Sequence, residues 1–143
     1  MLFPKKVKFR KWHTGRKNPK RISASVETRG AALSYGSFGL KSQSAGRIKS
    51  NQIEAARRAM ARHLGKTGRL WIRIFPDRPI TQKAAEVPMG KGKGDPVGFC
   101  ADIKSGRMIF EVDGIAGDIA RESLRKAGTK LPVKTKVVAR TVR

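Results

Sequence analysis

The chain of 143 residues contains a single cysteine, few acidic residues and no long apolar run. Because Cys100 has no partner for an internal disulfide, the sequence favours a reducing compartment, and we expect a cytoplasmic protein. No apolar segment approaches the roughly 20 residues that a membrane-spanning helix needs, so we expect no membrane partner. A chain of this length is typical of one compact domain.

Acidic side chains are scarce relative to basic ones. The sequence has 10 Asp and Glu against 33 Lys and Arg, a formal net charge of +23, and Glu27 is the only acid before Glu54. Such a charge opposes compaction unless a polyanion neutralises it, and RNA or DNA is the usual polyanion in cells. An anionic membrane surface is disfavoured because the basic residues do not gather on one amphipathic helix. The composition therefore predicts a nucleic-acid-binding protein.

Complete catalytic and cofactor motifs are also missing. Residues 65–67 have the ending of a phosphate-binding P-loop, but Met60 replaces its first glycine and the motif follows a predicted helix. The soft metal ligands share no metal-site spacing: His13, His63 and Cys100. Asp113, Asp118 and Glu122 could hold Mg²⁺ as a nuclease cluster does, but capping and solvation of a helix start explain them more simply. We therefore expect no enzyme, no cofactor and no metal.

Residues 1–32 are predicted to form a basic, extended N-terminal arm, because they contain few apolar residues around which to fold. We expect this arm to become ordered only on its partner. Its candidate RNA contacts are Lys5, Lys6, Lys8, Arg10, Lys11, Arg16, Lys17, Lys20 and Arg21. Trp12 and His13 interrupt the basic run and could stack on a base or a ribose. The sequence leaves open the alternative that Trp12 docks on the protein's own core.

Residues 33–143 are predicted to form the folded domain. A glycine-punctuated strand within 35–41 precedes a helix that a capping box of Asn51 and Glu54 would start. One face of this helix is an apolar stripe: Ile53, Ala56, Met60 and Leu64. The other face is basic, and we expect its arginines to be unpaired and free to bind phosphates: Arg57, Arg58 and Arg62. Three further candidate RNA contacts precede the helix: Lys41, Arg47 and Lys49.

The rest of the domain alternates strands and a helix. Residues 69–75 alternate like a strand that Pro76 and Pro79 would end, and 97–103 and 108–112 predict a hairpin around the turn 104–107. A helix over 117–127 and a last strand beginning near Pro132 follow. Together these elements predict the α+β class, a single compact domain with a mixed or antiparallel sheet and two helices packed on it.

A long glycine-lysine loop, residues 81–98, is predicted to protrude from this domain. Its centre alternates glycine and lysine: Met89, Gly90, Lys91, Gly92, Lys93 and Gly94. The glycines permit positive φ and close approach of the backbone, while the lysines supply charge. Because a long loop between two strands is usually functional, we expect this one to insert into RNA.

Six blocks, in chain order, resemble the bacterial large-subunit ribosomal protein sixteen family: residues 8–16, 37–41, 52–59, 72–81, 89–94 and 130–135. The resemblance implies a non-enzymatic, ribosome-bound protein that binds 23S-type rRNA at the base of the central protuberance, with 5S rRNA nearby. It implies late joining in assembly, contacts with neighbouring large-subunit proteins, and positioning of A-site and P-site tRNA near the peptidyl-transferase centre. By the same likeness, residues 89–94 reach toward tRNA.

The sequence departs from that family pattern in places. Pro88 stands where many members have an arginine that can be hydroxylated, so that modification does not carry over to this chain. Residues 95–99 differ from the usual acidic-aromatic run, and 17–34 is longer than usual. The alternative to a ribosomal role is a non-ribosomal nucleic-acid chaperone or nucleoid-type protein that uses the same charge.

Overall fold

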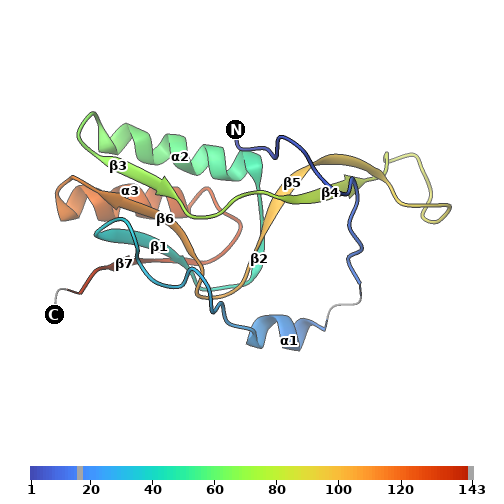
Figure 1. Cartoon of the computed structure of the whole chain (residues 1–143), viewed down its shortest axis with the longest axis horizontal. Helices are drawn as coiled ribbons and strands as arrows, with labels where there is room; N and C mark the ends of the chain where they lie inside the picture. The colour runs from blue at the N-terminus through green and yellow to red at the C-terminus, as the bar shows by residue number, and fades with distance from the viewer. Residues whose placement is uncertain (16–17, 142–143) are drawn as a thin grey trace.

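A computed structural model describes residues 1–15 and 18–141. Over these residues the chain is a single α+β domain with two antiparallel sheets (Figure 1), which confirms the predicted fold class. The elements are α1 Pro19–Ala24, β1 Phe38–Ser42, β2 Gly46–Lys49, α2 Ser50–Leu64, β3 Arg69–Ile72, β4 Arg78–Gln82, β5 Asp95–Ile103, β6 Met108–Asp113, α3 Gly117–Gly128 and β7 Thr135–Ala139.

The chain passes between the two sheets more than once. One sheet has the strand order β3-β6-β1-β7 and the other β2-β5-β4, so β1 to β2 and β5 to β6 each change sheet. The predicted hairpin at 104–107 is therefore wrong: the turn exists, but it sends β6 into the other sheet. The Gly106 N–H in this turn donates to the Ser42 carbonyl at 2.7 Å. Alternation of apolar and polar residues predicts where strands lie in the sequence, but not which strands pair with each other.

The core lies between the two long helices and the four-stranded sheet. The predicted stripe of α2 is buried, and it packs with α3 because both helices present apolar residues at helical spacing. The fully buried members of this cluster are Leu40, Ile48, Ile53, Ala56, Met60, Ile109, Phe110, Val112, Ala120, Leu124 and Ala127. The opposite, outer face of the four-stranded sheet is thus left for other segments to cover.

Helix α2 begins differently from the prediction. Its N-cap is Lys49, whose backbone N–H donates to the Gln52 side-chain oxygen at 2.9 Å. The predicted capping box of Asn51 and Glu54 is wrong, because the Glu54 carboxylate instead accepts hydrogen bonds from arginines one turn further along.

The short strands β2 and β4 are absent from the sequence-based expectation. β4 contains Pro79, which was expected only to end a strand, and β4 lies at the edge of its sheet, where a missing N–H is tolerated. The first and last residues of the predicted loop 81–98 belong to strands β4 and β5. The connection between them is therefore residues 83–94.

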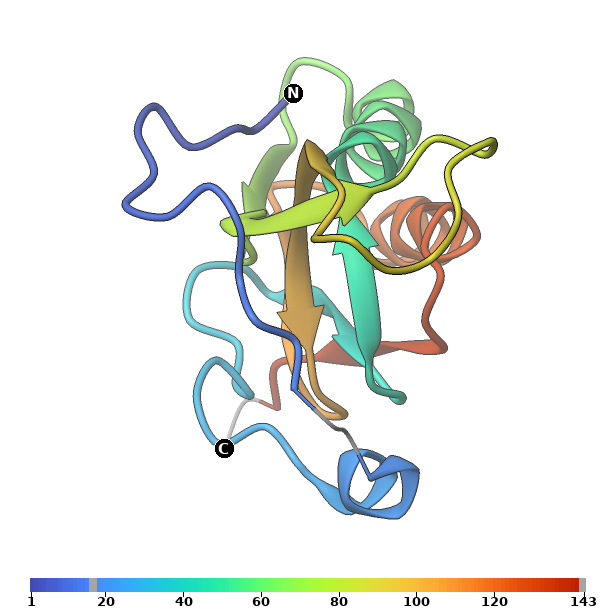
Figure 2. The same cartoon turned by 90° about the vertical axis from the view of Figure 1, so that its right-hand side faces the viewer.

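The N-terminal segment runs beside the sheets, on the side away from α2 and α3 (Figure 2). Phe3 packs edge-on against Phe99 with 6.2 Å between ring centroids, and Val26 forms a parallel bridge with Ser105. The short helix α1, which the sequence did not predict, starts at Pro19 after the Asn18 side chain accepts from the Lys20 N–H at 3.0 Å. Ordering of the arm on a partner stays a prediction.

Candidate nucleic-acid interface

The outer face of α2 carries the arginines that were expected to be unpaired. Arg57 instead donates two hydrogen bonds to Glu54, at 2.6 and 3.0 Å, and Arg58 donates one at 3.1 Å. The spacing of three and four residues places both guanidinium groups beside the one carboxylate. The expectation is wrong for these two residues, although none of the ion pairs between described residues involves Arg62.

Pairing lowers but does not cancel the positive charge of this face. The hydrogen bonds from Arg57, with a smaller contribution from Arg58, lower the pKa of Glu54 from 4.5 to about 2 despite partial burial. Glu54 is therefore ionised throughout the physiological range. Arg58 keeps 72% of its side chain exposed and uses one donor, so it and Arg62 are the most available phosphate contacts on α2.

Strand β2 carries two of the candidate contacts on one face. Arg47 and Lys49 are exposed and alternate with the fully buried Ile48. Arg47 donates to Asp102 at 3.1 Å and is partly neutralised, whereas Lys49 leads into α2. Lys41, on β1, is only half-buried. The basic surface of β2 therefore continues into the beginning of α2.

The loop 83–94 projects from the end of the three-stranded sheet (Figure 1). Its tip has three successive residues in the left-handed region, with φ of +101° at Gly90, +56° at Lys91 and +108° at Gly92. Met89 at the tip is 85% exposed. The glycines allow a turn that other residues would strain, and the turn carries an exposed lysine at its centre.

The arm touches this loop, although the two segments are about eighty residues apart in sequence. The Lys11 ammonium donates to the Lys93 carbonyl at 3.3 Å, and the Lys93 ammonium donates to the Trp12 carbonyl. The Arg78 guanidinium lies 5.6 Å from the centre of the Trp12 ring, which is 41% exposed. Of the two alternatives for Trp12, this conformation has it docked on the protein's own surface.

The other candidate residues of the arm are exposed and dispersed. They are Lys5, Lys6, Lys8, Arg10, His13, Lys20 and Arg21. Arg16 and Lys17 lie outside the described residues. Among the described arm residues, the hydrogen bonds to the loop thus involve Lys11 and Trp12.

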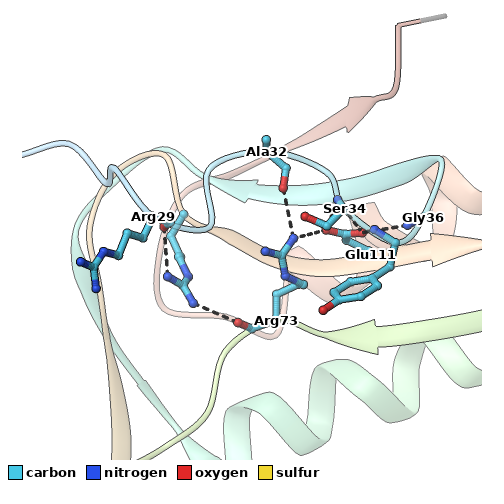
Figure 3. Close-up of polar contacts among 8 residues, drawn as sticks. Arg29, Ala32, Ser34, Gly36, Arg73 and Glu111 are labelled. Carbon is cyan, nitrogen blue, oxygen red and sulfur yellow. Dashed lines mark hydrogen bonds and ion pairs between the residues drawn. The ribbon is translucent and has the colours of Figure 1, made fainter.

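Sequence reasoning missed a buried acid on the outer face of the four-stranded sheet. Glu111, fully buried on β6, accepts hydrogen bonds from the backbone N–H groups of Ser34, Tyr35 and Gly36 at 3.0, 2.6 and 2.8 Å (Figure 3). Arg73 also donates to Glu111. Burial raises the pKa of Glu111, but the backbone and Arg73 hydrogen bonds outweigh it and the pKa is lowered. The available signal was one acid inside an otherwise apolar strand.

Two arginines extend this buried contact along the segment that precedes β1. Arg73 donates to the Ala32 carbonyl at 3.1 Å, and Arg107 donates to the carbonyls of Arg29 and Arg73 at 3.0 and 3.1 Å (Figure 3). At Gly36 a Cβ would lie 2.6 Å from the Val112 carbonyl, so only glycine permits the close approach. Residues 29–36 are therefore fixed across the outer face of the sheet.

Two of the three acids that were considered as a magnesium cluster make structural contacts. Asp113 accepts from the Ser37 hydroxyl at 3.0 Å, and Glu122 pairs with Arg125 at 2.8 Å. Burial raises the pKa of the Cys100 thiol. Among the described residues, no three His, Cys, Asp or Glu side chains gather as metal ligands would, and no helix is both long and apolar enough to cross a membrane.

One comparison with known proteins places the chain in a family. The family model described as ribosomal protein L16p/L10e matches residues 4–138, which include nearly all of the arm, the loop 83–94 and most of β7. All six sequence blocks noted above fall inside this range. The chain belongs to the ribosomal protein L16p/L10e family, whose members are structural, non-enzymatic constituents of the large ribosomal subunit.

Proposed function

We propose that this chain binds large-subunit rRNA near the base of the central protuberance, supports late subunit assembly, and helps position tRNA at the A site near the peptidyl-transferase centre. The observation that carries the proposal is the loop 83–94, which projects beyond the domain with a left-handed tip and two exposed lysines. Such a tip can enter a narrow RNA-walled space, because its glycine backbone is slim and Lys91 at its centre is exposed.

The rRNA contacts that we propose are the arm, the basic face of β2 and the outer face of α2. Phosphates supply most of the affinity in such interfaces, and a guanidinium with free donors matches their geometry best. Arg58 and Arg62 are therefore stronger candidates than Arg57, which is occupied by Glu54. We further propose a cytoplasmic ribosome with 5S rRNA and other large-subunit proteins as neighbours; the family match does not favour a non-ribosomal chaperone.

The proposed binding of rRNA by the outer face of α2 can be tested by comparing arginines that have free hydrogen-bond donors with Arg57, which is bound to Glu54. Replacing Arg58 and Arg62 with Gln is expected to weaken rRNA binding by roughly 10- to 100-fold, because charge-assisted hydrogen bonds to phosphate are removed. Arg57→Gln is the matched control and should change affinity little, whereas Glu54→Gln should strengthen binding by releasing two guanidinium groups. Fluorescence anisotropy on an rRNA fragment measures all three. Unchanged affinity in the double variant would show that this face of α2 is exposed to solvent and does not bind rRNA.

The loop can be tested by reversing its charge. Lys91→Glu with Lys93→Glu is expected to slow tRNA accommodation or late subunit maturation, because two anions would face a phosphate-lined wall. The effect should shrink as salt or Mg²⁺ screens it. Translation assays and gradient profiles of subunit precursors are the measurements, and the matched control is Lys91→Gln with Lys93→Gln, which removes charge without reversing it. ATP or GTP binding that the reversal abolishes would show instead that the loop is a nucleotide cradle.

A further inference from the structure

Two aromatic side chains lie stacked on the outer face of the four-stranded sheet, on the side away from the helices. The rings of Tyr35 and Trp71 have centroids 6.0 Å apart and an interplanar angle of 18°. Tyr35 remains 60% exposed and nearby Phe75 46% exposed. These three residues line an open hollow of about 770 Å³ beside β3, within the usual size range of small-ligand sites. Trp71 is half-buried beneath this surface, so Tyr35 and Phe75 are the rings that a ligand in the hollow would contact.

Glu111, the pairing of β3 with β6, and Arg73 hold the aromatic pair in place. Glu111 accepts the Tyr35 backbone N–H at 2.6 Å, which fixes the residue while leaving its side chain outside. Trp71 stands directly across from Glu111 in the register of β3 and β6. The Arg73 guanidinium, bound to Glu111, lies 5.4 Å from the centre of the Tyr35 ring. The surface is therefore preorganised, so that binding a ligand would cost little ordering entropy.

The charge around the pair favours an anionic ligand with a flat face. Arg69 is exposed, lies on the same side of β3 as Trp71, and takes part in none of the ion pairs between described residues, whereas the charge of Arg73 is already balanced by the buried Glu111. Strand β3 is an edge strand of its sheet. Asp77 and Asp102 lie on the wall of the hollow, but Asp102 is paired with Arg47 and Arg78 at 3.1 and 2.7 Å. An unpaired nucleotide combines a flat ring for stacking with a phosphate for Arg69, whereas the bases of a duplex are already stacked.

We propose that Tyr35 and Trp71 form a stacking site for one unpaired base of RNA, with Arg69 beside its phosphates. The site is separate from the α2 face and from the loop 83–94, and it rests on the proposed RNA-binding function. The site contributes to RNA affinity through ring stacking, so it distinguishes single-stranded RNA from duplex RNA. The basic surfaces alone do not make this distinction.

The test compares Tyr35→Leu with Tyr35→Phe in the full chain. Both variants keep the backbone N–H that binds Glu111, but only phenylalanine keeps the ring. Tyr35→Leu is expected to weaken binding of a single-stranded adenylate oligomer by roughly 5- to 100-fold, the range for removal of one base-aromatic stack. Binding to an RNA duplex should change less than about twofold, and the salt dependence should stay the same because every basic side chain is retained. Tyr35→Phe should bind both probes like the wild type.

A second readout detects the stack directly. The Trp12→Phe chain keeps Trp71 as its only tryptophan, and its fluorescence should be quenched by the adenylate oligomer but not by inorganic polyphosphate, which carries charge without rings. Equal affinities of Tyr35→Leu and Tyr35→Phe in a chain that binds RNA would overturn the stacking site alone. A wild type that binds neither probe would overturn the proposed RNA-binding function and the stacking site together.

Discussion

The affinity of the chain for rRNA is expected to fall about a thousandfold or more when salt rises from about 50 to about 200 mM, if on the order of six to ten phosphates are contacted. Each phosphate that a lysine or arginine neutralises releases condensed counterions, and added salt opposes that release. Ion pairs between described residues engage only Arg47, Arg57, Arg58, Arg73, Arg78, Arg125 and Lys126. Most of the lysines and arginines in the described part of the chain therefore form no ion pair and can contact a polyanion.

Anisotropy titrations of one rRNA fragment over a salt series measure this dependence. The variant with Arg58→Gln and Arg62→Gln is the matched control, because its slope should be shallower by nearly one unit for each phosphate that the variant no longer neutralises. A nearly flat response in the wild type would contradict the claim that phosphates dominate the interface.

Replacing Glu111 with Ala is expected to lower the free energy of unfolding by about 3 to 5 kcal/mol, the usual cost of breaking a buried ion pair. The change leaves the Arg73 side chain, only 16% exposed, without its carboxylate, and it removes the acceptor of three backbone N–H groups. Since small domains have about 5 to 15 kcal/mol in total, the variant should lose a large part of its stability. Urea denaturation of both proteins measures the difference.

Two further variants show whether the loss of stability comes from burial. Glu122→Ala removes an exposed acid that also pairs with arginine and lysine, and it should change stability little. Glu111→Gln keeps an acceptor of nearly the same shape and should be destabilised less than Glu111→Ala. Equal destabilisation of Glu122→Ala and Glu111→Ala would show that the hydrogen bonds to residues 34–36 do not stabilise the fold.

The same residue gives the stability a defined pH dependence. Burial opposes ionisation of Glu111, but the hydrogen bonds from Gly36, Ser34, Tyr35 and Arg73 prevail, so its pKa in the folded state is below the ordinary 4.5. The unfolded chain then takes up the proton first as the pH falls. The stabilisation is complete above the unfolded pKa and is lost as the pH falls through the folded pKa. Glu111→Gln should therefore remove part of the acid-induced loss of stability.

Periodicity in the sequence predicted the α+β class, both long helices and the buried stripe of α2. These features follow from local spacing: Ile53, Ala56 and Met60 recur at the helical repeat, and α3 ends at the predicted glycine. Strand β2 has Ile48 as its only apolar residue, and β4 contains Pro79, so neither segment shows an alternating apolar pattern. The sheet change at 104–107 depends on long-range pairing that no local pattern encodes.

The interface was predictable in composition but not in detail. Charge identified the arm, the α2 arginines and the loop as candidates, whereas pairing of Arg57 and Arg58 with Glu54 depends on side-chain conformation. The contact of Lys11 with Lys93 joins distant segments of like charge, which sequence reasoning would place apart. Glu111 was missed because three of its partners are backbone N–H groups, which carry no residue-specific signal, and its side-chain partner Arg73 is distant in the sequence.

A density map of the large ribosomal subunit that carries this chain tests the proposed function most directly. We predict that the loop 83–94 lies ordered among RNA close to the A-site tRNA position, and that the outer face of α2 and the arm lie against rRNA phosphates. A map in which the loop points into solvent, with these basic surfaces turned away from RNA, would contradict this placement.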